Sequence, residues 1–195
     1  MSTEELALQD VVAGRVRVGR PLSSRSDGAL VRAAQRGSAD AVDELFRRHW
    51  PAAHHAAWLV VHDAGAAEDI AQEAFLSALR ALDRFDRRRP LGPWLHRIVV
   101  NRAIDWSRAR ALRPEASADT VPEPAAPATN TQLGDEVVAA LAGLGPEHRA
   151  VVVLRHLLGY TPGEIAAMLD LPRGTVNSRL RRALDALAVA LETDK

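Results

Sequence analysis

The segment from residue 160 to residue 187 constrains the fold more than any other part of the chain. Thr161, Pro162 and Glu164 stand in the order of a helix N-cap, a first-position proline and the acidic partner of a capping box. These residues predict a short helix that ends at the break Asp170–Pro172. A second helix follows the break, so the segment predicts two helices around a tight turn.

The second of these helices differs sharply between its faces. Between residues 173 and 182 it carries four arginines and no acid. Such a helix suits the DNA major groove, which needs donors for phosphates and base edges. The same pattern also fits a solvated helix in an ordinary bundle. The other segments of the chain have to decide between DNA binding and a purely structural helix. Apolar residues expected to face inward at helical spacing are Val176, Leu180, Ala183, Leu184 and Leu187.

Composition favours an all-α fold of one domain or two small ones. The 195 residues are 47% apolar but only 4% aromatic, and the many alanines suit closely packed helices. The absence of cysteine excludes disulfides, a thiol nucleophile and a cysteine metal site. No cofactor motif is found. Because no apolar run reaches membrane length and no signal-peptide core is seen, we expect a soluble cytoplasmic protein without membrane insertion.

Charge is unevenly distributed although the formal net charge is zero. Segment 27–83 has five basic and nine acidic residues, whereas segment 84–113 has nine basic and two acidic ones. Segment 114–134 has three acids and no base, and segment 135–172 has five acids and two arginines. Separate basic and acidic surfaces indicate more than one partner.

The first half of the chain predicts a mobile arm and two capped helices. Residues 1–26 lack clear periodicity, apart from a possible short helix near Glu4 to Val12. Helices are expected from Asp27 to Gly37 and, capped by Ser38, to about Val61 with a kink at Pro51. Histidines one turn apart could hold a metal, but no ligand motif accompanies them and ordinary packing is the favoured interpretation. These histidines are His49, His54, His55 and His62.

Segment 66–83 has the cleanest helical periodicity in the chain. Its opposite face is acidic, with Leu76 in its midst. That face is either simply solvated or a docking face for a basic helix. The acidic residues of this face are poor candidates for catalytic acids, because no nucleophile lies nearby and an open helical face implies no cleft. The expected inward residues are Ala67, Ile70, Ala71, Ala74, Phe75, Ala78, Leu79 and Leu82.

Segment 84–93 predicts a basic loop, because Pro90 and Pro93 should end regular structure. A helix is expected from about Trp94 to Ala111. Basic and aromatic residues together suit single-stranded DNA, although Trp94 at helical spacing also fits the core. The four prolines of segment 114–134 then predict a flexible linker able to span roughly 60 Å.

Two further helices are expected between this linker and the helix-turn-helix. The first, from Asp135, should end at Gly145, and the second, from Pro146, should end at Gly159. The domains expected are therefore an N-terminal arm (1–26), a helical domain (27–113), the linker (114–134) and a second helical domain (135–195).

Three motifs in series resemble the bacterial extracytoplasmic-function (ECF, group 4) sigma factors of the sigma-70 family. AEDIAQEAFLSALRALDRF at 67–85 is similar to region 2.2, and WLHRIVVNRAIDWSR at 94–108 to regions 2.3–2.4. GYTPGEIAAMLDLPRGTVNSRLRRALDAL at 159–187 is similar to region 4.2. The resemblance implies a non-catalytic protein that binds core RNA polymerase, recognises and melts the −10 element, and binds the −35 element.

The resemblance also implies roles for individual residues. Docking on the clamp helices of the largest polymerase subunit falls to Asp69, Gln72, Glu73 and Leu76. Capture of the −10 strand falls to Phe85, Arg87, Arg88, Arg89, Asn101 and Arg108. Readout of the −35 element falls to Arg173, Thr175, Asn177, Ser178, Arg181 and Arg182, with Arg179 open between DNA backbone and an intradomain pair.

Other implied partners are the polymerase flap region, promoter DNA and an anti-sigma factor. Promoter elements 16–19 base pairs apart lie roughly 55–65 Å apart, which the linker can bridge. Two departures from the family pattern are Asn177, where a basic residue is frequent, and Asp170, where glycine is frequent. Asp170 tolerates the left-handed conformation better than most residues.

Two other interpretations remain open. A helix-turn-helix regulator acting without polymerase would need neither the acidic face of 66–83 nor the basic segment 84–113. A small helical enzyme using Glu68, Asp69 or Glu73 lacks a nucleophile, a phosphate loop and a metal cluster.

Overall fold

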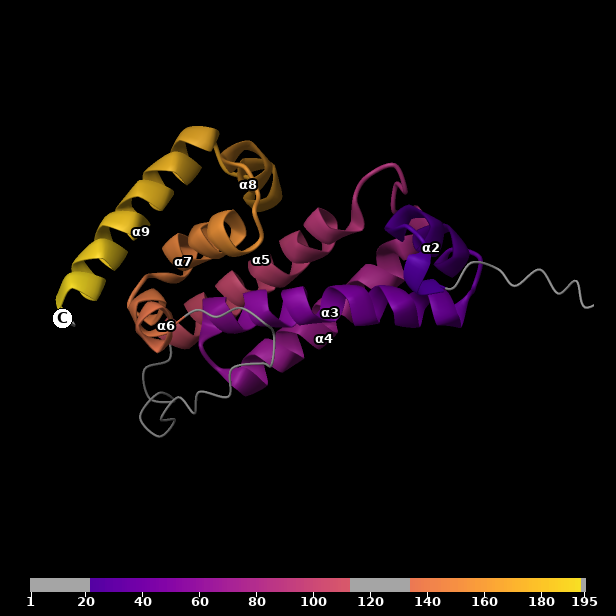
Figure 1. Ribbon diagram of the computed structural model, residues 1–195, viewed down its shortest axis with the longest axis horizontal. Coiled ribbons are helices and arrows are strands. Elements are labelled where there is room, and N and C mark those ends of the chain that lie inside the picture. The colour runs from indigo at the N-terminus through magenta and orange to yellow at the C-terminus, as the bar shows by residue number, and fades with distance from the viewer. Residues whose placement is uncertain (1–21, 113–133, 194–195) are drawn as a thin grey trace, which may run out of the picture.

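The computed structural model describes residues 22–112 and 134–193, and those residues form helices and connecting turns without a strand (Figure 1). The expected all-α fold is confirmed. The short helix expected near Glu4 and nearly all of the linker lie outside the described residues. The α-helices are α2 (Asp27–Ala34), α3 (Ala39–Val61), α4 (Ala64–Ala81), α5 (Leu91–Ala111), α6 (Asp135–Ala142), α7 (Pro146–Val152), α8 (Pro162–Leu169) and α9 (Arg173–Thr193).

Side-chain caps start most of the N-terminal helices. Ser26 caps α2 and Ser38 caps α3, each accepting a hydrogen bond from the backbone N–H three residues on. Helix α3 continues through Pro51 and ends at His62, which adopts the left-handed conformation. The expected boundary near Val61 is confirmed, and α3 becomes the long element against which α4 and α5 pack.

The start of α4 is tied to the end of α5 through one carboxylate. Asp63 Oδ1 accepts a hydrogen bond of 3.0 Å from the Ala66 N–H, which caps α4. Asp63 Oδ2 accepts a bond of 2.9 Å from Arg110 Nη1 near the end of α5. The acidic helix therefore begins at Ala64 and is held in register with the basic helix.

The prediction that Pro93 ends regular structure is wrong. Helix α5 begins at Leu91, and Pro93 is its third residue. First-turn residues have no acceptor for their N–H within the helix, so a proline there removes no hydrogen bond. The basic loop is consequently shorter than expected, and a 3-10 turn (Leu82–Arg84) precedes it.

The C-terminal helices confirm the capping box and change two other expectations. Thr161 Oγ1 accepts from the Glu164 N–H, Glu164 Oε2 accepts from the Thr161 N–H, and Asp170 is left-handed with φ 53°. Helix α6 ends at Ala142 rather than at Gly145, because Gly143 is its C-cap. Helix α7 passes into a π-helical turn, η4 (Val153–Leu157), which periodicity did not predict.

One apolar cluster runs through both groups of helices. It joins Leu59 and Val60 of α3 and Val99 of α5 to Leu141 of α6 and Val151 of α7. Helices α7 and α8 lie along α5, and α9 forms a further layer beyond α7 (Figure 1). Two residues expected inside are partly exposed instead: Leu79 at 38% and Leu184 at 44%. No helix among the described residues is long and apolar enough to cross a membrane.

Replacing Asp63 tests whether its carboxylate positions α4. Asp63→Ala removes both the cap and the bond to Arg110, and should lower the free energy of unfolding by about 1–2 kcal/mol, measured by urea denaturation. Asp63→Asn keeps a capping oxygen and should lose less. Equal losses for the two variants would show that the cap contributes nothing.

Candidate functional site

The exposed face of α4 brings together the four residues predicted to bind polymerase. Asp69, Gln72, Glu73 and Leu76 are all exposed, with Leu76 at 52%. Gln72 Nε2 donates to Glu68 Oε1 at 3.0 Å. Glu73 Oε2 accepts a bond of 2.7 Å from Arg102 Nη1 of α5. The face is therefore an ordered acidic surface with an exposed leucine at its centre.

A polar hollow of about 330 Å³ lies beside this face, between α4 and α5. Three carboxylates line it, from Asp69, Glu73 and Asp105, together with Arg102 and the Trp106 ring. Arg110 lies over the Trp106 ring with its guanidinium carbon 5.1 Å from the ring centroid, as in a cation–π contact. Sequence reasoning missed Trp106, because nothing in the local pattern shows that its ring meets α4.

Four of the predicted −10 residues gather at the start of α5. Phe85 packs against Trp94 with ring centroids 4.6 Å apart, and Gln35 Nε2 donates to the Leu82 and Phe85 carbonyls at 2.9 and 3.1 Å. The arginines at 87–89 are exposed. The half-buried Phe85 ring therefore lies close in sequence to three exposed arginines.

The other two predicted −10 residues lie further along α5. Asn101 is half-buried, and Arg108 is 17 residues beyond Leu91, about 26 Å along the helix axis. Arg108 is already bonded: its Nε and Nη2 atoms lie 2.9 and 2.7 Å from Glu147 Oε1. The structure therefore does not bring Arg108 together with the Phe85 group.

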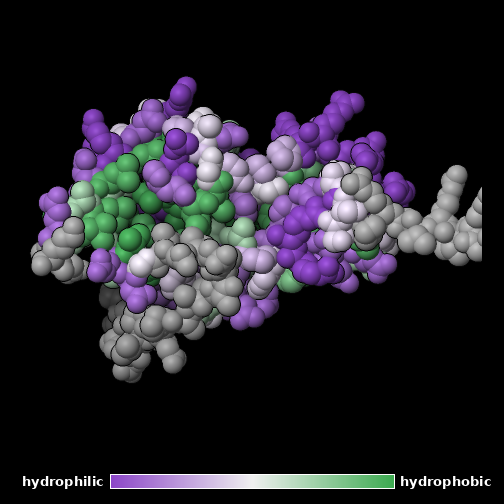
Figure 2. Space-filling view, in the orientation of Figure 1, coloured by the Kyte–Doolittle hydropathy of each residue, from purple (hydrophilic) through white to green (hydrophobic). Residues whose placement is uncertain are grey.

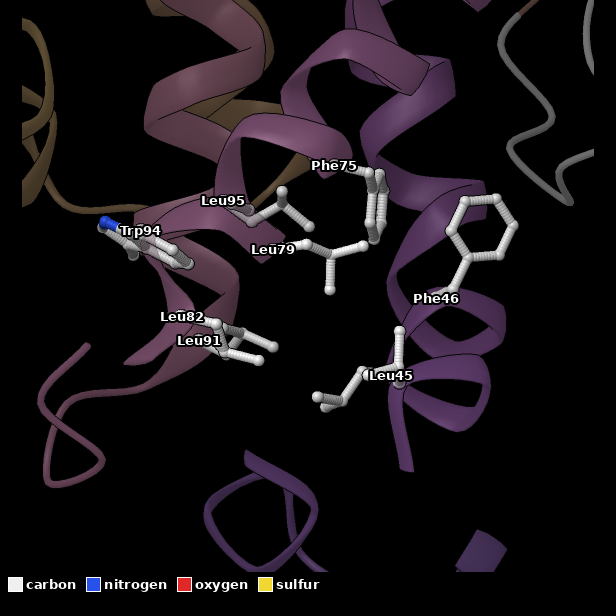
Figure 3. A pocket seen from close by; sticks show the side chains of 10 residues that line it. Leu45, Phe46, Phe75, Leu79, Leu82, Leu91, Trp94 and Leu95 are labelled. Carbon is white, nitrogen blue, oxygen red and sulfur yellow. The ribbon is translucent and has the colours of Figure 1, made fainter. Parts of the chain in front are cut away.

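An apolar crevice lies between α3, α4 and α5, near the start of α5 (Figure 3). Its walls include Phe46, Phe75, Leu79 and Trp94, and Phe46 is 40% exposed. Its volume is about 30 Å³, far below the roughly 300–1,000 Å³ of typical ligand pockets, so the crevice is too small for a substrate. Its lining supports Trp94 as a core residue with one exposed edge.

Helix α9 presents most of the predicted −35 residues to solvent. Arg173, Asn177, Arg181 and Arg182 are exposed, whereas Thr175 and Ser178 are half-buried. The Ser178 hydroxyl donates to the Thr175 carbonyl at 2.9 Å, so it meets any further partner chiefly as an acceptor. Their positions leave Arg173 in the first turn of the helix, and the pair Arg181 and Arg182 in its third turn, exposed to solvent.

The four histidines of α3 and its C-cap are buried or half-buried: His49, His54, His55 and His62. Among the described residues no group of three histidine, cysteine or acidic side chains could hold a metal ion. Burial lowers the pKa of His54, of His55 and, to about 4, of His62. His49 Nε2 lies 2.8 Å from Asp27 Oδ2. These contacts match the structural interpretation of the histidines.

An apolar groove of about 230 Å³ opens on the C-terminal helices. Figure 2 shows hydrophobic surface gathered at this end, whereas the end near α2 is mostly hydrophilic. The partly exposed Leu184 of α9 lies on its wall, which explains why that residue does not face inward. Other wall residues are Val137, Leu141, Val152, Leu157 and Leu187.

A helix-turn-helix with exposed arginines, an exposed acidic face on α4 and an exposed basic loop are the features of a helical DNA-binding protein. The family model Sigma-70 region 2 matches residues 45–113, and the model Sigma-70, region 4 matches residues 134–187. The chain belongs to the sigma-70 family and is an ECF sigma factor, a class that directs RNA polymerase to promoters.

Relatives and solved structures agree with this assignment. The chain is 38% identical to the ECF RNA polymerase sigma factor SigM of Mycobacterium tuberculosis over 84% of each chain. It is 34% identical to the ECF RNA polymerase sigma-E factor of Escherichia coli, covering 83% of this chain and 92% of the relative.

Two solved complexes have a similar fold. CnrH, in complex with the cytosolic domain of CnrY, has a TM-score of 0.66 at 31% identity, covering 87% of this chain and 99% of CnrH. RpoE of Bartonella quintana, in complex with the anti-sigma factor NepR, has a TM-score of 0.64 at 26% identity, covering 78% of this chain and 98% of RpoE.

Substitutions on α9 should separate base readout from phosphate binding. For polymerase holoenzyme bound to promoter fragments, Arg181→Ala should weaken binding to all −35 sequences alike and lower the salt dependence by about one counterion. Asn177→Ala should instead change the ranking of −35 sequences at nearly constant salt dependence. Salt titrations over a panel of −35 variants measure both. The same salt slope change in both variants would overturn this division.

Proposed function

We propose that this protein binds core RNA polymerase through α4 and reads the two promoter elements through different helix groups. The group α2–α5 (within residues 27–113) recognises and melts the −10 element. The group α6–α9 (within 135–195) binds the −35 element. The observation that carries the proposal is that the acidic α4 face and the arginine face of α9 are both solvent-exposed on one folded chain.

Docking on polymerase is proposed to use the α4 face and the hollow beside it. Asp69 and Glu73 line the hollow as well as the face, so a basic side chain entering it meets carboxylates and the Trp106 ring together. Both attract a guanidinium group. The exposed Leu76 supplies apolar contact at the centre of the face. The matching partner is a basic helix such as the polymerase clamp helices.

Strand capture is proposed for the start of α5. Unstacking a base costs a few kcal/mol, so it requires both a stacking surface and phosphate contacts. Phe85 and Trp94 supply aromatic surface, and the arginines at 87–89 supply charge beside it. Asn101 lies further along the same helix, α5, and completes the proposed −10 surface. Arg108 adds a phosphate contact when its ion pair with Glu147 breaks.

Readout of the −35 element is proposed for α9. Arg173, Thr175, Asn177 and Ser178 occupy the N-terminal part of the helix, which enters the major groove in helix-turn-helix proteins. Arg181 and Arg182 lie one to two turns later and are proposed to contact phosphates. The left-handed Asp170 supports this role, because it ends α8 and lets the chain turn tightly into α9.

Two further protein contacts follow from the surfaces and the comparisons. The apolar groove of α6, η4 and α9 is proposed to receive the polymerase flap region, since it is an apolar opening of about 230 Å³ on the C-terminal helices. An anti-sigma factor is proposed as a regulatory partner, because RpoE was solved with one. Acting on polymerase and DNA, the protein would work in the cytoplasm and without catalysis of its own.

Transcription in a purified system tests the proposed function. Core polymerase with this protein should start transcripts at defined promoters, and mapping the starts would reveal the −10 and −35 sequences together. A regulator acting without polymerase would bind DNA alone and leave core polymerase unchanged. The absence of both core binding and promoter-specific transcripts would overturn the proposal.

Paired substitutions on α4 test the docking surface. Gln72→Ala with Glu73→Ala should weaken binding to core polymerase about tenfold, because two exposed side chains of the proposed docking face are removed. Binding of the α9 surface to DNA should stay intact. Asp83→Ala removes an exposed acid outside α4 and should leave the affinity unchanged. Affinity is measured by fluorescence anisotropy of the labelled protein. Equal loss of polymerase and DNA binding would indicate misfolding rather than a docking defect.

A further inference from the structure

One corner of the molecule holds the last residues of the N-terminal arm and the basic loop together. An apolar cluster at this corner contains Leu82 and Leu91, which stand on either side of the loop 83–90, and Leu22 packs against the same cluster. Helix α2 lies next to the loop that precedes α5 (Figure 1), and a Cβ at Gly28 of α2 would lie 3.6 Å from the Arg87 carbonyl oxygen. The structure describes the arm from Leu22 onward, so its described part begins beside the proposed −10 surface.

The described residues of the arm are held to α3 through Arg48. Its Nη1 donates to the Arg25 carbonyl at 3.1 Å, and its Nη2 donates to the Ser23 carbonyl at 3.3 Å. The same guanidinium forms ion pairs with Asp27 and Glu44. The position of this part of the arm is therefore fixed by polar contacts as well as by the packing of Leu22.

Positive charge gathers on both sides of this corner. The side chains of Arg87, Arg88 and Arg89 are exposed, and no carboxylate among the described residues forms an ion pair with them. The loop 83–90 has four arginines and two acids in total, and the arm segment 14–21 has three arginines and no acid. The arginines of the arm segment are Arg15, Arg17 and Arg20, and the acids of the arm that precede them are Glu4, Glu5 and Asp10.

The length of the chain keeps these arginines near the loop. An extended chain spans at most about 3.6 Å per residue, so the Cα atom of Arg20 lies within about 7 Å of that of Leu22, and the Cα atom of Arg15 within about 25 Å. Like charges repel one another over the Debye length of about 8 Å at physiological salt. A polyanion between the arm segment and the loop would remove this repulsion.

We propose that Arg15, Arg17 and Arg20 bind DNA phosphates next to the −10 element, together with the arginines at 87–89. Basic N-terminal arms bind nucleic acid, and such arms can lie along a groove beside the site that a folded domain reads. In an extended segment alternate side chains point to the same side, which would turn Arg15 and Arg17 toward the DNA together. Phosphate contacts carry no sequence information, so the arm adds affinity without a sequence preference.

DNA fits these charges better than the acids of the protein do. Asp40 and Asp43 are exposed near the start of α3 and are the alternative partners of the arm within this chain. Two carboxylates are too few to neutralise the arginines of both the arm segment and the loop. Duplex DNA carries one phosphate charge per about 1.7 Å of its axis and offers a partner to each arginine.

Neutralising the arm segment should lower the salt dependence of DNA binding. The variant combines Arg15→Gln, Arg17→Gln and Arg20→Gln in polymerase holoenzyme bound to a promoter fragment. Because three phosphate contacts are lost, the slope of log affinity against log salt should be smaller by about 2–3, and the affinity at low salt should fall about tenfold or more. All three positions precede Leu22, so the contacts among the described residues are unchanged, and circular dichroism checks the fold.

Two matched variants separate charge from other effects of altering the arm. Replacing the same three arginines by lysine keeps the charges and should keep the slope of the parent protein. Val16→Gln with Val18→Gln alters the same segment without changing its charge and should also keep that slope. A slope as low as that of the glutamine variant in either control would overturn the phosphate contact.

A cross-linker in the arm segment should locate the contact. With Val18 replaced by p-benzoylphenylalanine, the holoenzyme on a promoter fragment should cross-link to DNA within about one helical turn, roughly 10 base pairs, of the −10 element. Cross-linking to a polymerase subunit in place of DNA would overturn the proposal. Cross-linking to α3 near Asp40 and Asp43 would overturn it as well, because the arm would then be folded onto its own chain.

The inference rests on the proposed function for the position of the contact beside a −10 element, but the arm's affinity for phosphates does not. The parent and the glutamine variant are therefore also compared without polymerase on a duplex of random sequence, where the variant should again have the smaller slope. That result would support the arm contact even if no promoter-specific transcript were made. Promoter-specific transcription with an unchanged slope in the glutamine variant would overturn the arm contact and leave the proposed function intact.

Discussion

The guanidinium of Arg149 is the contact on which the arrangement of the helices most depends. It is nearly fully buried, and it donates hydrogen bonds to three backbone carbonyls, of Val60 in α3, of Ala142 at the end of α6 and of Leu144 just beyond it, rather than to a carboxylate. A buried cation without acceptors would be costly, so the ends of α3 and α6 must lie where they do once Arg149 is in the core. Because α7 carries Arg149, its position against α3 and α5 follows, and α8 and α9 are placed in turn.

This placement decides which faces stay open. Burying α7 against α3 and α5 leaves the acidic side of α4 and the arginine side of α9 facing solvent on different parts of the molecule. Each face also depends on a local cap: Asp63 starts α4, and the left-handed Asp170 ends α8 at the turn into α9. The acidic face of α4 and the arginine face of α9 therefore reach solvent while the apolar sides of both helices serve the core.

Local patterns predicted the elements well, because their causes are local. The periodicity of α4, the capping box at Thr161 and the left-handed Asp170 all depend on residues within a few positions of one another. The sequence patterns gave less information about contacts between residues that lie far apart in the sequence. The Leu184 side chain lines an open groove, and Arg108 is bonded 39 positions away to Glu147, neither of which periodicity can show. Pro93 was misjudged for a local reason, since a helix tolerates proline in its first turn.

Contacts within the folded chain give part of the charge pattern a second explanation. The basic segment 84–113 and the acidic segment 135–172 first indicate two external partners. In the folded chain part of that complementarity is internal, because Arg108 of the first segment bonds Glu147 of the second. An exposed ion pair contributes little by itself and is weakened by salt. The apolar cluster and the buried Arg149 therefore contribute most of the attachment between the two groups of helices.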